Sequence, residues 1–301
     1  MPAERGTRGF HDRLAVVFDF DDTLAPATVP WLLGRLGIDD PVRWEHAHLQ
    51  PYVDDDWDKL LAHGPLLRRA ASERGIVLTR AIAEEAGRSL PVFDGVEAAL
   101  PALRELGRTV SGGAMVDLYV LSSGFVEIMG ASRAAKYFDA LWGSALDWDD
   151  QDRLVGVKRA IIHSEKARYL LALAKGLDLK GADEPEDVHV EKPIDEWHVP
   201  LDQMIYVGDG LSDLDAFKLI HENGGIALGV DHSGSGEWPA ADHMFASARV
   251  DNLAPADFRE GQELYRSLVL AVECVSKRVA LRRLASERQG ARRDADPAAV
   301  S

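Results

Sequence analysis

Apolar residues run almost without interruption through three segments of the chain, and each run stops at a polar or glycine-rich turn. Runs of this length and continuity predict strands that are buried on both faces of a sheet. Between them, apolar residues recur at helical spacing. Strands that alternate with helices predict a doubly wound, mostly parallel α/β sheet. The predicted strands cover residues 14–20, 116–124 and 203–210, with a shorter one at 225–230, and the predicted helices cover 95–107, 125–138, 164–176 and 212–225.

Residues 25–90 do not follow this alternation. They contain three tryptophans (Trp31, Trp44 and Trp57) and helical patterns such as WDKLLAHGPLLRRAASERG, but no strong strand pattern. We interpret the tryptophans as packing residues, with a substrate platform as the alternative. The prediction therefore has an α/β core, a small α-helical insert and a disordered C-terminal tail, over residues 1–24 with 91–285, 25–90 and 286–301. A polar, acidic loop is expected at 178–200.

The chain of 301 residues carries a formal net charge of −16, and this charge is unevenly spread. Residues 277–293 hold seven basic residues and one acidic residue, which leaves 27 basic against 49 acidic residues elsewhere. An acidic body disfavours a nucleic-acid partner. We interpret the basic segment as a helix face that pairs with this body. Contact with a second subunit is the alternative, so a homodimer stays open.

Two further features bear on the compartment. The chain has a single cysteine, Cys274, so an internal disulfide is excluded and a reducing compartment is favoured. No apolar run reaches the roughly 18 residues of a membrane span, and the first twelve residues lack the apolar core of a signal peptide. We therefore expect a cytoplasmic protein with no membrane partner.

Polar residues gather where the predicted strands end. Ligands of open α/β sheets bind beyond the carboxyl ends of the strands. Several carboxylates there would repel each other unless a cation lay among them, and an all-oxygen ligand set favours Mg²⁺. Lys166, at the start of a predicted helix, offers a fixed positive charge. The polar residues at this edge are Asp19 and Asp21 after the first strand, Ser122, Ser123 and Gly124 at the second, and Asp209 and Asp213 after the third.

Four short motifs in these places resemble those of the haloacid dehalogenase superfamily of phosphatases. The motifs are DFDDTL, VLSSG, EKARYLLALAKG and VGDGLSD, and they occur in the family's order between Asp19 and Asp213. The helical insert lies between the first and second motifs, where this family places a cap domain. The layout is similar to that of the phosphoserine-phosphatase-like branch, so the resemblance implies a Rossmann-like core with a helical cap.

The resemblance implies roles for the two aspartates of the first motif. Asp19 would be the nucleophile, because a carboxylate is ionised at neutral pH without an activating base. Asp21 would be the general acid that protonates the leaving alcohol, and later the base that activates water. The alternative for both residues is a polar turn after a strand.

The resemblance also implies a magnesium site and a phosphate site. Mg²⁺ would bind the carboxylate of Asp19, the backbone carbonyl of Asp21 and Asp209, with Asp213 as a direct or water-mediated ligand. Phosphoryl oxygens would bind the backbone amides of the second motif, Lys166 and one serine hydroxyl. Ser122 is favoured over Ser123, and Lys166 over Lys158, which lies in a predicted hairpin strand. These phosphate-binding residues are Ser122, Ser123, Gly124 and Lys166.

The expected function is a Mg²⁺-dependent phosphomonoester hydrolase that acts on a small phosphorylated metabolite through an aspartyl-phosphate. Ser123 stands where phosphoserine phosphatases usually have glycine, so that substrate does not follow from the resemblance. A phosphotransferase or mutase and a phosphoprotein phosphatase would use the same residues. A 2-haloacid dehalogenase would not need Asp21 or Asp209, and a non-catalytic binding protein is expected to have lost part of the motif set.

Overall fold

A seven-stranded sheet forms the centre of the molecule in the computed structural model, which describes residues 11–178, 185–232 and 249–295. The strand order is β4-β3-β2-β1-β5-β6-β7, and every neighbouring pair is parallel except β3 and β4. The strands are β1 (Arg13–Phe18), β2 (Met115–Phe125), β3 (Ala140–Trp148), β4 (Leu154–Arg159), β5 (Met204–Gly208), β6 (Ile226–Asp231) and β7 (Asn252–Pro255).

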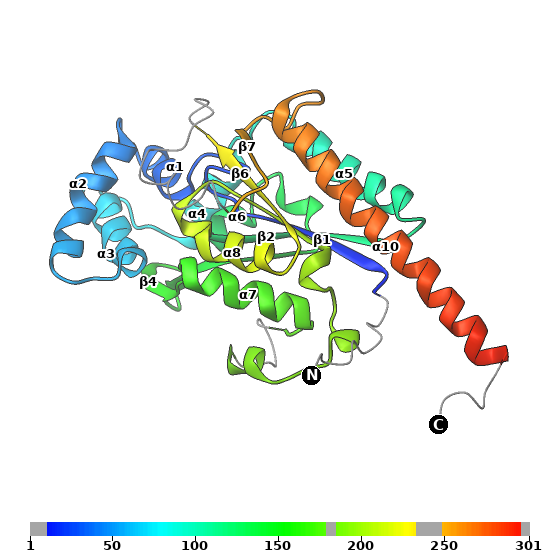
Figure 1. Cartoon of the computed structure of the whole chain (residues 1–301). Helices are drawn as coiled ribbons and strands as arrows, with labels where there is room; N and C mark the ends of the chain where they lie inside the picture. The colour runs from blue at the N-terminus through cyan, green and yellow to red at the C-terminus, as the bar shows by residue number, and fades with distance from the viewer. Residues whose placement is uncertain (1–10, 179–184, 233–248, 296–301) are drawn as a thin grey trace.

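Helices cover both faces of this sheet (Figure 1). Successive side chains of β1 point to opposite faces, so Val16 and Phe18 pack with α5 and α10, whereas Ala15 and Val17 pack with α7 and α8. All four side chains are completely buried. The predicted doubly wound, mostly parallel α/β fold is therefore confirmed. The covering helices are α5 (Val96–Val110), α7 (His163–Lys175), α8 (Leu214–Glu222) and α10 (Glu263–Ala295).

Two predicted elements differ in the structure. The helix expected over 125–138 is instead the short α6 (Val126–Met129) and a 3₁₀ turn at Ala135–Tyr137, and Gly130, a poor helix former, follows α6. The tail expected to be disordered over 286–301 is helical as far as Ala295, as the end of α10, and residues 296–301 lie outside the described part. The predicted loop at 178–200 contains short 3₁₀ turns in its described part.

The basic segment at the end of the chain binds the body of the molecule. Arg282 forms an ion pair with Asp202, and its guanidinium donates to Gln203 Oε1 at 2.7 Å. Arg283 pairs with Asp12, and Arg278 donates to the backbone carbonyl of Gly224 at 2.7 Å. These contacts confirm for three arginines that α10 pairs with the rest of the chain. No helix in the described ranges has an apolar stretch long enough to cross a membrane.

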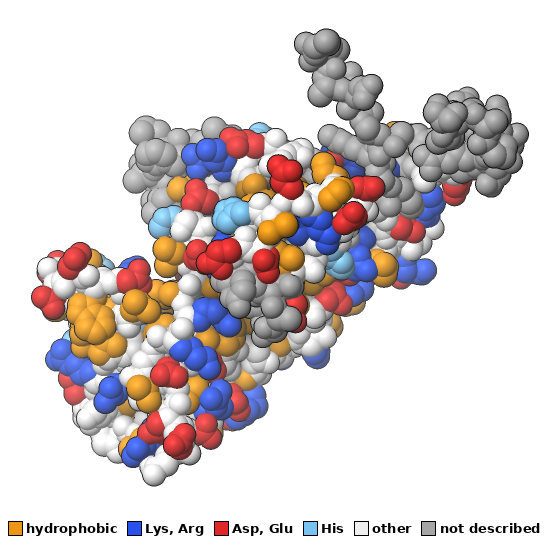
Figure 2. Space-filling view, turned by 90° about the horizontal axis from the view of Figure 1, so that it is seen from below, with side chains coloured by type: hydrophobic (Ala, Val, Ile, Leu, Met, Phe, Trp, Pro, Cys, Tyr) orange, Lys and Arg blue, Asp and Glu red, His pale blue; other side chains and the backbone are white. Residues whose placement is uncertain are grey.

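The residues between β1 and α5 form four helices that pack directly on the core. They lie at one end of the sheet in Figure 1, and Figure 2 shows hydrophobic side chains gathered on the α2–α3 lobe at the left. Apolar residues of this insert, such as Leu33 and Leu67, belong to the same buried cluster as Phe18. The four helices are α1 (Thr28–Arg35), α2 (Pro41–Asp54), α3 (Lys59–Ser72) and α4 (Arg80–Ser89).

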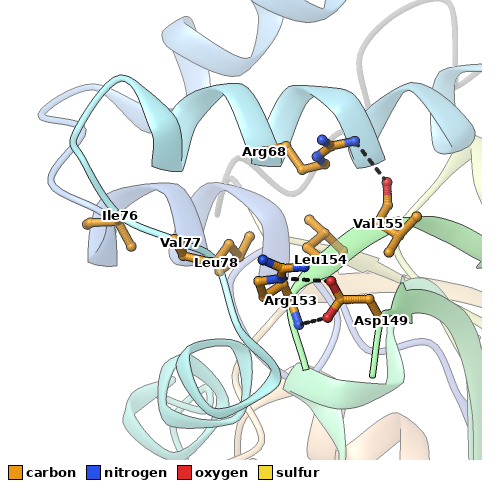
Figure 3. Close-up of a pocket in the computed structure, with 8 residues that line it drawn as sticks. All are labelled: Arg68, Ile76, Val77, Leu78, Asp149, Arg153, Leu154 and Val155. Carbon is orange, nitrogen blue, oxygen red and sulfur yellow. Dashed lines mark hydrogen bonds and ion pairs between the residues drawn. The ribbon is translucent and has the colours of Figure 1, made fainter. Parts of the chain in front are cut away.

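Backbone hydrogen bonds also join the insert to the β3–β4 hairpin. The amide of Leu154 donates to the carbonyl of Leu78 at 2.9 Å. Figure 3 shows Arg68 reaching from α3 toward the Val155 carbonyl, with Nη1 at 3.4 Å. A cavity of about 400 Å³ lies between these segments. Arg153, which lines this cavity, forms an ion pair with Asp149 at 2.7 Å. We therefore interpret the cavity as a packing gap between the insert and the hairpin and not as a binding site.

The close approach of α4 to α6 gives a stability prediction. A Cβ at Gly87 would lie 2.1 Å from the Ile128 carbonyl oxygen, so Gly87→Ala forces two backbone segments apart. Helix propensity alone would favour Ala by about 1 kcal/mol. We nevertheless expect a loss of about 3 kcal/mol in the free energy of unfolding, measured in urea. Gly156→Ala is the control, because its Cβ would meet no atom within 4 Å. Equal stability of both variants would contradict this packing.

Candidate active site

The ends of β1, β2 and β5 meet a large cavity beneath the insert. This cavity, called the candidate cavity below, has a volume of about 770 Å³. The sheet side contributes Asp21, Ser123 and Gly124, and the insert contributes residues of α2 and α3. Polar and apolar side chains therefore face the same space, as in sites that bind small molecules. The full lining is Asp21, Val29, Glu45, Asp58, Lys59, Leu60, His63, Ser123, Gly124, Phe125, Ile162, His163, Ser212, Leu214, Asp215 and Arg249.

A tight turn after β1 positions the first-motif aspartates. The amide of Asp19 donates to the Val207 carbonyl at 2.7 Å, which continues the parallel pairing with β5. Asp22 then adopts φ of 55°, a left-handed conformation that aspartate tolerates better than most residues. Its amide donates to the Ala25 carbonyl at 2.7 Å and closes the turn. As a result, Asp19 is 3% exposed and Asp21 lines the candidate cavity.

Lys166 lies between two carboxylates and is completely buried. Its Nζ is 3.1 Å from Asp19 Oδ1 and donates to Asp213 Oδ1 at 2.6 Å and to Ser212 Oγ at 3.2 Å. Burial alone would lower the pKa of Lys166, but the negative charges of Asp19 and Asp213 outweigh it and hold the pKa above its ordinary value. The ammonium is therefore a permanent positive charge beside Asp19.

Asp213 holds Lys166 and the turn after β5 in place through hydrogen bonds. Its carboxylate accepts hydrogen bonds from the Tyr206 hydroxyl at 2.5 Å and from the amides of Asp209 and Gly210 at 3.1 and 3.3 Å. A Cβ at position 208 would lie 2.4 Å from Asp213 Oδ2, which explains the glycine there. Since both oxygens already accept hydrogen bonds, this geometry favours a supporting role for Asp213 over direct metal ligation.

The first-motif aspartates have separated pKa values. Burial raises the pKa of Asp19 to about 6, although the charge of Lys166 opposes the rise. Burial, together with the charge of Asp19, raises the pKa of Asp21 to about 8, although a hydrogen bond from Thr28 opposes it. At pH 7 Asp19 is therefore mostly ionised and Asp21 mostly protonated. Such a pair suits a nucleophile beside a general acid.

The acidic cluster fits a divalent cation. Asp19, Asp209 and Asp213 bring one carboxylate oxygen each within 4.8 Å of one another. Asp19 Oδ1 is buried and accepts no hydrogen bond from the residues that the structure describes, and its contact with Lys166 is an ion pair. Burial and the charges of Asp19 and Asp213 raise the pKa of Asp209 well above its ordinary value, as expected for carboxylates without their cation. Hard oxygen donors of this kind suit Mg²⁺.

The serines of the second motif occupy different places. Ser122 is completely buried, and its Oγ accepts a hydrogen bond from the Gly124 amide at 3.1 Å. A hydrogen bond to Ser122 also lowers the pKa of Asp19, so this buried serine stabilises the ionised form of that carboxyl group. Ser123 and Gly124 border the candidate cavity. The exposed Lys158 lies outside this cluster, in β4.

Some residues of the site carry no sequence signal. Thr28, at the start of α1, donates from Oγ1 to Asp21 Oδ2 at 2.9 Å and is completely buried. Tyr206 lies in an apolar strand and looks like a core residue, yet its hydroxyl holds Asp213. His232 joins Asp22 and Asp209 in a second group of ligand atoms within 4.8 Å of one another. Sequence spacing alone could have identified none of them.

Trp31 and Trp44 of the insert pack against the core, whereas Trp57 is exposed. Trp31 donates from Nε1 to the Ala86 carbonyl at 2.9 Å. Trp44 stacks on His48 with ring centroids 4.0 Å apart, and Trp57 packs edge-on against Tyr52. None of the three lines the candidate cavity in the described part of the chain. The interpretation as packing residues is thus favoured over a substrate platform for Trp31 and Trp44.

Comparisons with known proteins agree with this architecture. No protein-family model matches the chain. A protein of Borreliella burgdorferi that is described only as uncharacterized is 23% identical over 208 residues, which cover 63% of this chain and 69% of that protein. Similarity to solved structures extends over most of the chain.

Three of these structures are hydrolases or phosphatases by description. A HAD family hydrolase of Salmonella enterica serovar Typhi superposes with a TM-score of 0.56 at 14% identity, over 88% of this chain and 73% of that one. A probable phosphoserine phosphatase of Vibrio cholerae superposes with a TM-score of 0.53 at 15% identity, over 90% of this chain and 68% of that one. A substrate-bound phosphoserine phosphatase superposes with a TM-score of 0.50 at 18% identity, over 85% of this chain and 97% of that one. The chain therefore has the fold of the HAD hydrolases, as its four motifs predict.

Proposed function

We propose that the protein is a Mg²⁺-dependent hydrolase of small phosphomonoesters that works through an aspartyl-phosphate. The arrangement of the two first-motif aspartates carries this proposal. Asp19 is mostly ionised at pH 7 and held against Lys166, and Asp21 is mostly protonated and lines a cavity large enough for a metabolite. The HAD hydrolase fold supports the same chemistry.

The residues divide the reaction into two steps. In the first, a carboxylate oxygen of Asp19 attacks phosphorus, the bond from phosphorus to the leaving oxygen breaks, and Asp21 gives its proton to that oxygen. In the second, Asp21 takes a proton from water as the water oxygen attacks phosphorus. The bond between phosphorus and the Asp19 oxygen then breaks, and inorganic phosphate leaves. Both carboxylates return to their starting protonation states.

Phosphate binding depends on fixed donors and charges near Asp19. Lys166 offsets the negative charge of the nucleophile and of the phosphoryl group. Its hydrogen bonds to Asp213 and Ser212 fix its position. Asp19, Asp209 and the Asp21 carbonyl would hold Mg²⁺, with Asp213 as support. When bound, this cation would neutralise charge on the phosphoryl oxygens.

Metal removal tests the proposal. We expect EDTA to abolish hydrolysis of p-nitrophenyl phosphate and Mg²⁺ to restore it, because Lys166 supplies a single positive charge to a cluster of three aspartates. Excess Ca²⁺ should inhibit, since it prefers more ligands at longer distances. Phosphate release is the measurement, and Asp19→Asn protein purified in parallel controls for contaminating phosphatases. Full activity in metal-free buffer would exclude this mechanism.

Thr28 gives a prediction about the general acid. Thr28→Val keeps the shape of the side chain but removes the donor that holds Asp21. After Asp21 has given up its proton, a hydrogen bond to the resulting carboxylate contributes about 1.5–3 kcal/mol, so we expect kcat for alkyl phosphates to fall roughly 10- to 100-fold. The loss should be smaller for p-nitrophenyl phosphate, whose leaving group needs little protonation. Thr28→Ser should retain the wild-type pattern. Equal losses on both substrates would instead indicate a packing role.

A further inference from the structure

Two ionisable residues of the insert form a pair on the cavity wall. Glu45 comes from α2 and His63 from α3, and both line the candidate cavity together with Asp21. The His63 Nε2 and Glu45 Oε1 atoms are 2.8 Å apart. The His63 ring packs edge-on against Phe125 with centroids 6.2 Å apart, directly after the second motif. The pair therefore lies in the same cavity as Asp21, the general acid of the proposed function.

The pair places hydrogen-bond acceptors at the wall of the candidate cavity. An ionised carboxylate can only accept, so the Nε2 of His63 carries the proton that Glu45 receives. In the neutral ring this leaves Nδ1 as an acceptor. That atom is buried and has no hydrogen-bond partner in the described part of the chain. Glu45 has a second carboxylate oxygen, and its side chain is 17% exposed. Each residue of the pair thus keeps one acceptor that no described residue of the chain binds.

Packing alone does not account for these residues. The neighbours of His63 on α3 include Ala62 and Leu66, which form a small apolar cluster with Leu49. An apolar residue would fill position 63 without leaving a buried nitrogen unpartnered. The side chain of His63 is 6% exposed, so this nitrogen has little access to bulk solvent. A buried polar atom of this kind calls for a partner that the described part of the chain does not supply.

We propose that Glu45 and His63 form the subsite for the leaving group, and that the natural substrate carries a hydrogen-bond donor on its leaving group, away from the phosphate. The inference rests on the proposed phosphatase function and deepens it. A hydroxyl and an amine are both donors, and either would meet the acceptors of Glu45 and His63. Side-chain adjustments of the size needed to reach Nδ1 are common on ligand binding. A site built to bind such a donor discriminates against analogues that lack it.

The test compares three phosphomonoesters of similar size. Propyl phosphate has no donor on its leaving group, glycerol 3-phosphate has hydroxyls, and O-phosphoethanolamine has an amine. We expect wild-type kcat/KM to favour at least one donor-bearing ester over propyl phosphate by about 10- to 100-fold. The preferred ester then distinguishes a hydroxyl from an amine as the recognised group.

Conservative variants assign the preference to the pair. His63→Gln keeps a donor toward Glu45 but removes the Nδ1 acceptor, and Glu45→Gln removes the charge at nearly constant shape. Each should reduce the preference about tenfold, mainly through a higher KM for the donor-bearing ester. His63→Asn, which keeps an acceptor near the Nδ1 position, should restore part of it. His46→Gln is the control, because His46 is exposed on α2 and does not line the cavity.

The outcomes separate the two proposals. If wild type hydrolyses all three esters with Mg²⁺ but shows no preference, or if every variant keeps the wild-type preference, the subsite is wrong and the phosphatase stands. If wild type hydrolyses no phosphomonoester at all, the proposed function fails and the subsite fails with it. Thermal unfolding of each variant is measured alongside, and a ratio of two substrates on the same protein is insensitive to the fraction folded.

Discussion

We expect Asp19→Asn to form no phosphoenzyme from any phosphomonoester and Asp21→Asn to accumulate it. The first substitution removes the attacking carboxylate. The second leaves the nucleophile and Lys166 in place but removes the proton donor and the later base. With an alkyl phosphate, the Asp21 variant should lose roughly 10²- to 10⁴-fold in rate, the usual contribution of general acid–base catalysis. With p-nitrophenyl phosphate, the rate of phosphoenzyme formation should change little, whereas the rate of aspartyl-phosphate hydrolysis should fall.

Intact-protein mass after an acid quench measures the phosphoenzyme directly. Asp39→Asn serves as the control, because Asp39 is exposed in the insert and distant in sequence from every motif. Accumulation in the Asp19 variant, or normal turnover in both variants, would show that the two roles are wrongly assigned. The pKa values of about 6 and about 8 give the physical reason for expecting this order of roles and not the reverse.

The second large effect is expected at Lys166. Lys166→Met removes the charge that lies 3.1 Å from Asp19 Oδ1 and 2.6 Å from Asp213 Oδ1. We expect kcat/KM to fall by roughly 10³-fold, as when one fixed charge or donor is lost from a transition state. Two carboxylates would also remain buried without their partner, which should lower the free energy of unfolding by about 3–5 kcal/mol.

Lys158→Met is the matched control for this prediction. Lys158 lies in β4, is exposed and competes with Lys166 in the sequence as a source of positive charge. Its loss should change neither turnover nor stability measurably. Circular dichroism and urea unfolding establish the folded fraction of the Lys166 variant before its rates are compared. Normal turnover by folded Lys166→Met protein would remove Lys166 from the mechanism.

Local sequence patterns predicted the residues at the strand ends well, because the carboxyl ends of parallel strands must lie at the same edge of the sheet. Once three apolar runs become neighbouring strands, Asp19, Asp209 and Asp213 must lie at one edge, although about 190 residues separate the first two. Lys166 follows in the same way, because α7 starts at that edge. The sequence could therefore indicate which residues gather, and the structure brings them together.

Other parts depend on packing between distant segments, which no local pattern encodes. The contact between Thr28 and Asp21 exists because α1 begins where the turn after β1 ends. Glu45 and His63 meet only because α2 and α3 pack side by side, and each residue alone looks like an ordinary helix residue. The missed strands β3 and β7 are short or partly exposed, so they lack the continuous apolar runs of the central strands.

The junction between the insert and the β3–β4 hairpin has a consequence for how the chain unfolds. Leu154 bonds to Leu78, Gly64 of α3 lies so close to the backbone of Gly156 that a Cβ would approach it to 2.9 Å, and one apolar cluster runs through both parts. Elements that share a core melt together as one cooperative unit. The insert and the sheet should therefore unfold in a single transition, and a truncated chain without residues 25–90 would expose the apolar side chains beneath α1 and α4 and tend to aggregate.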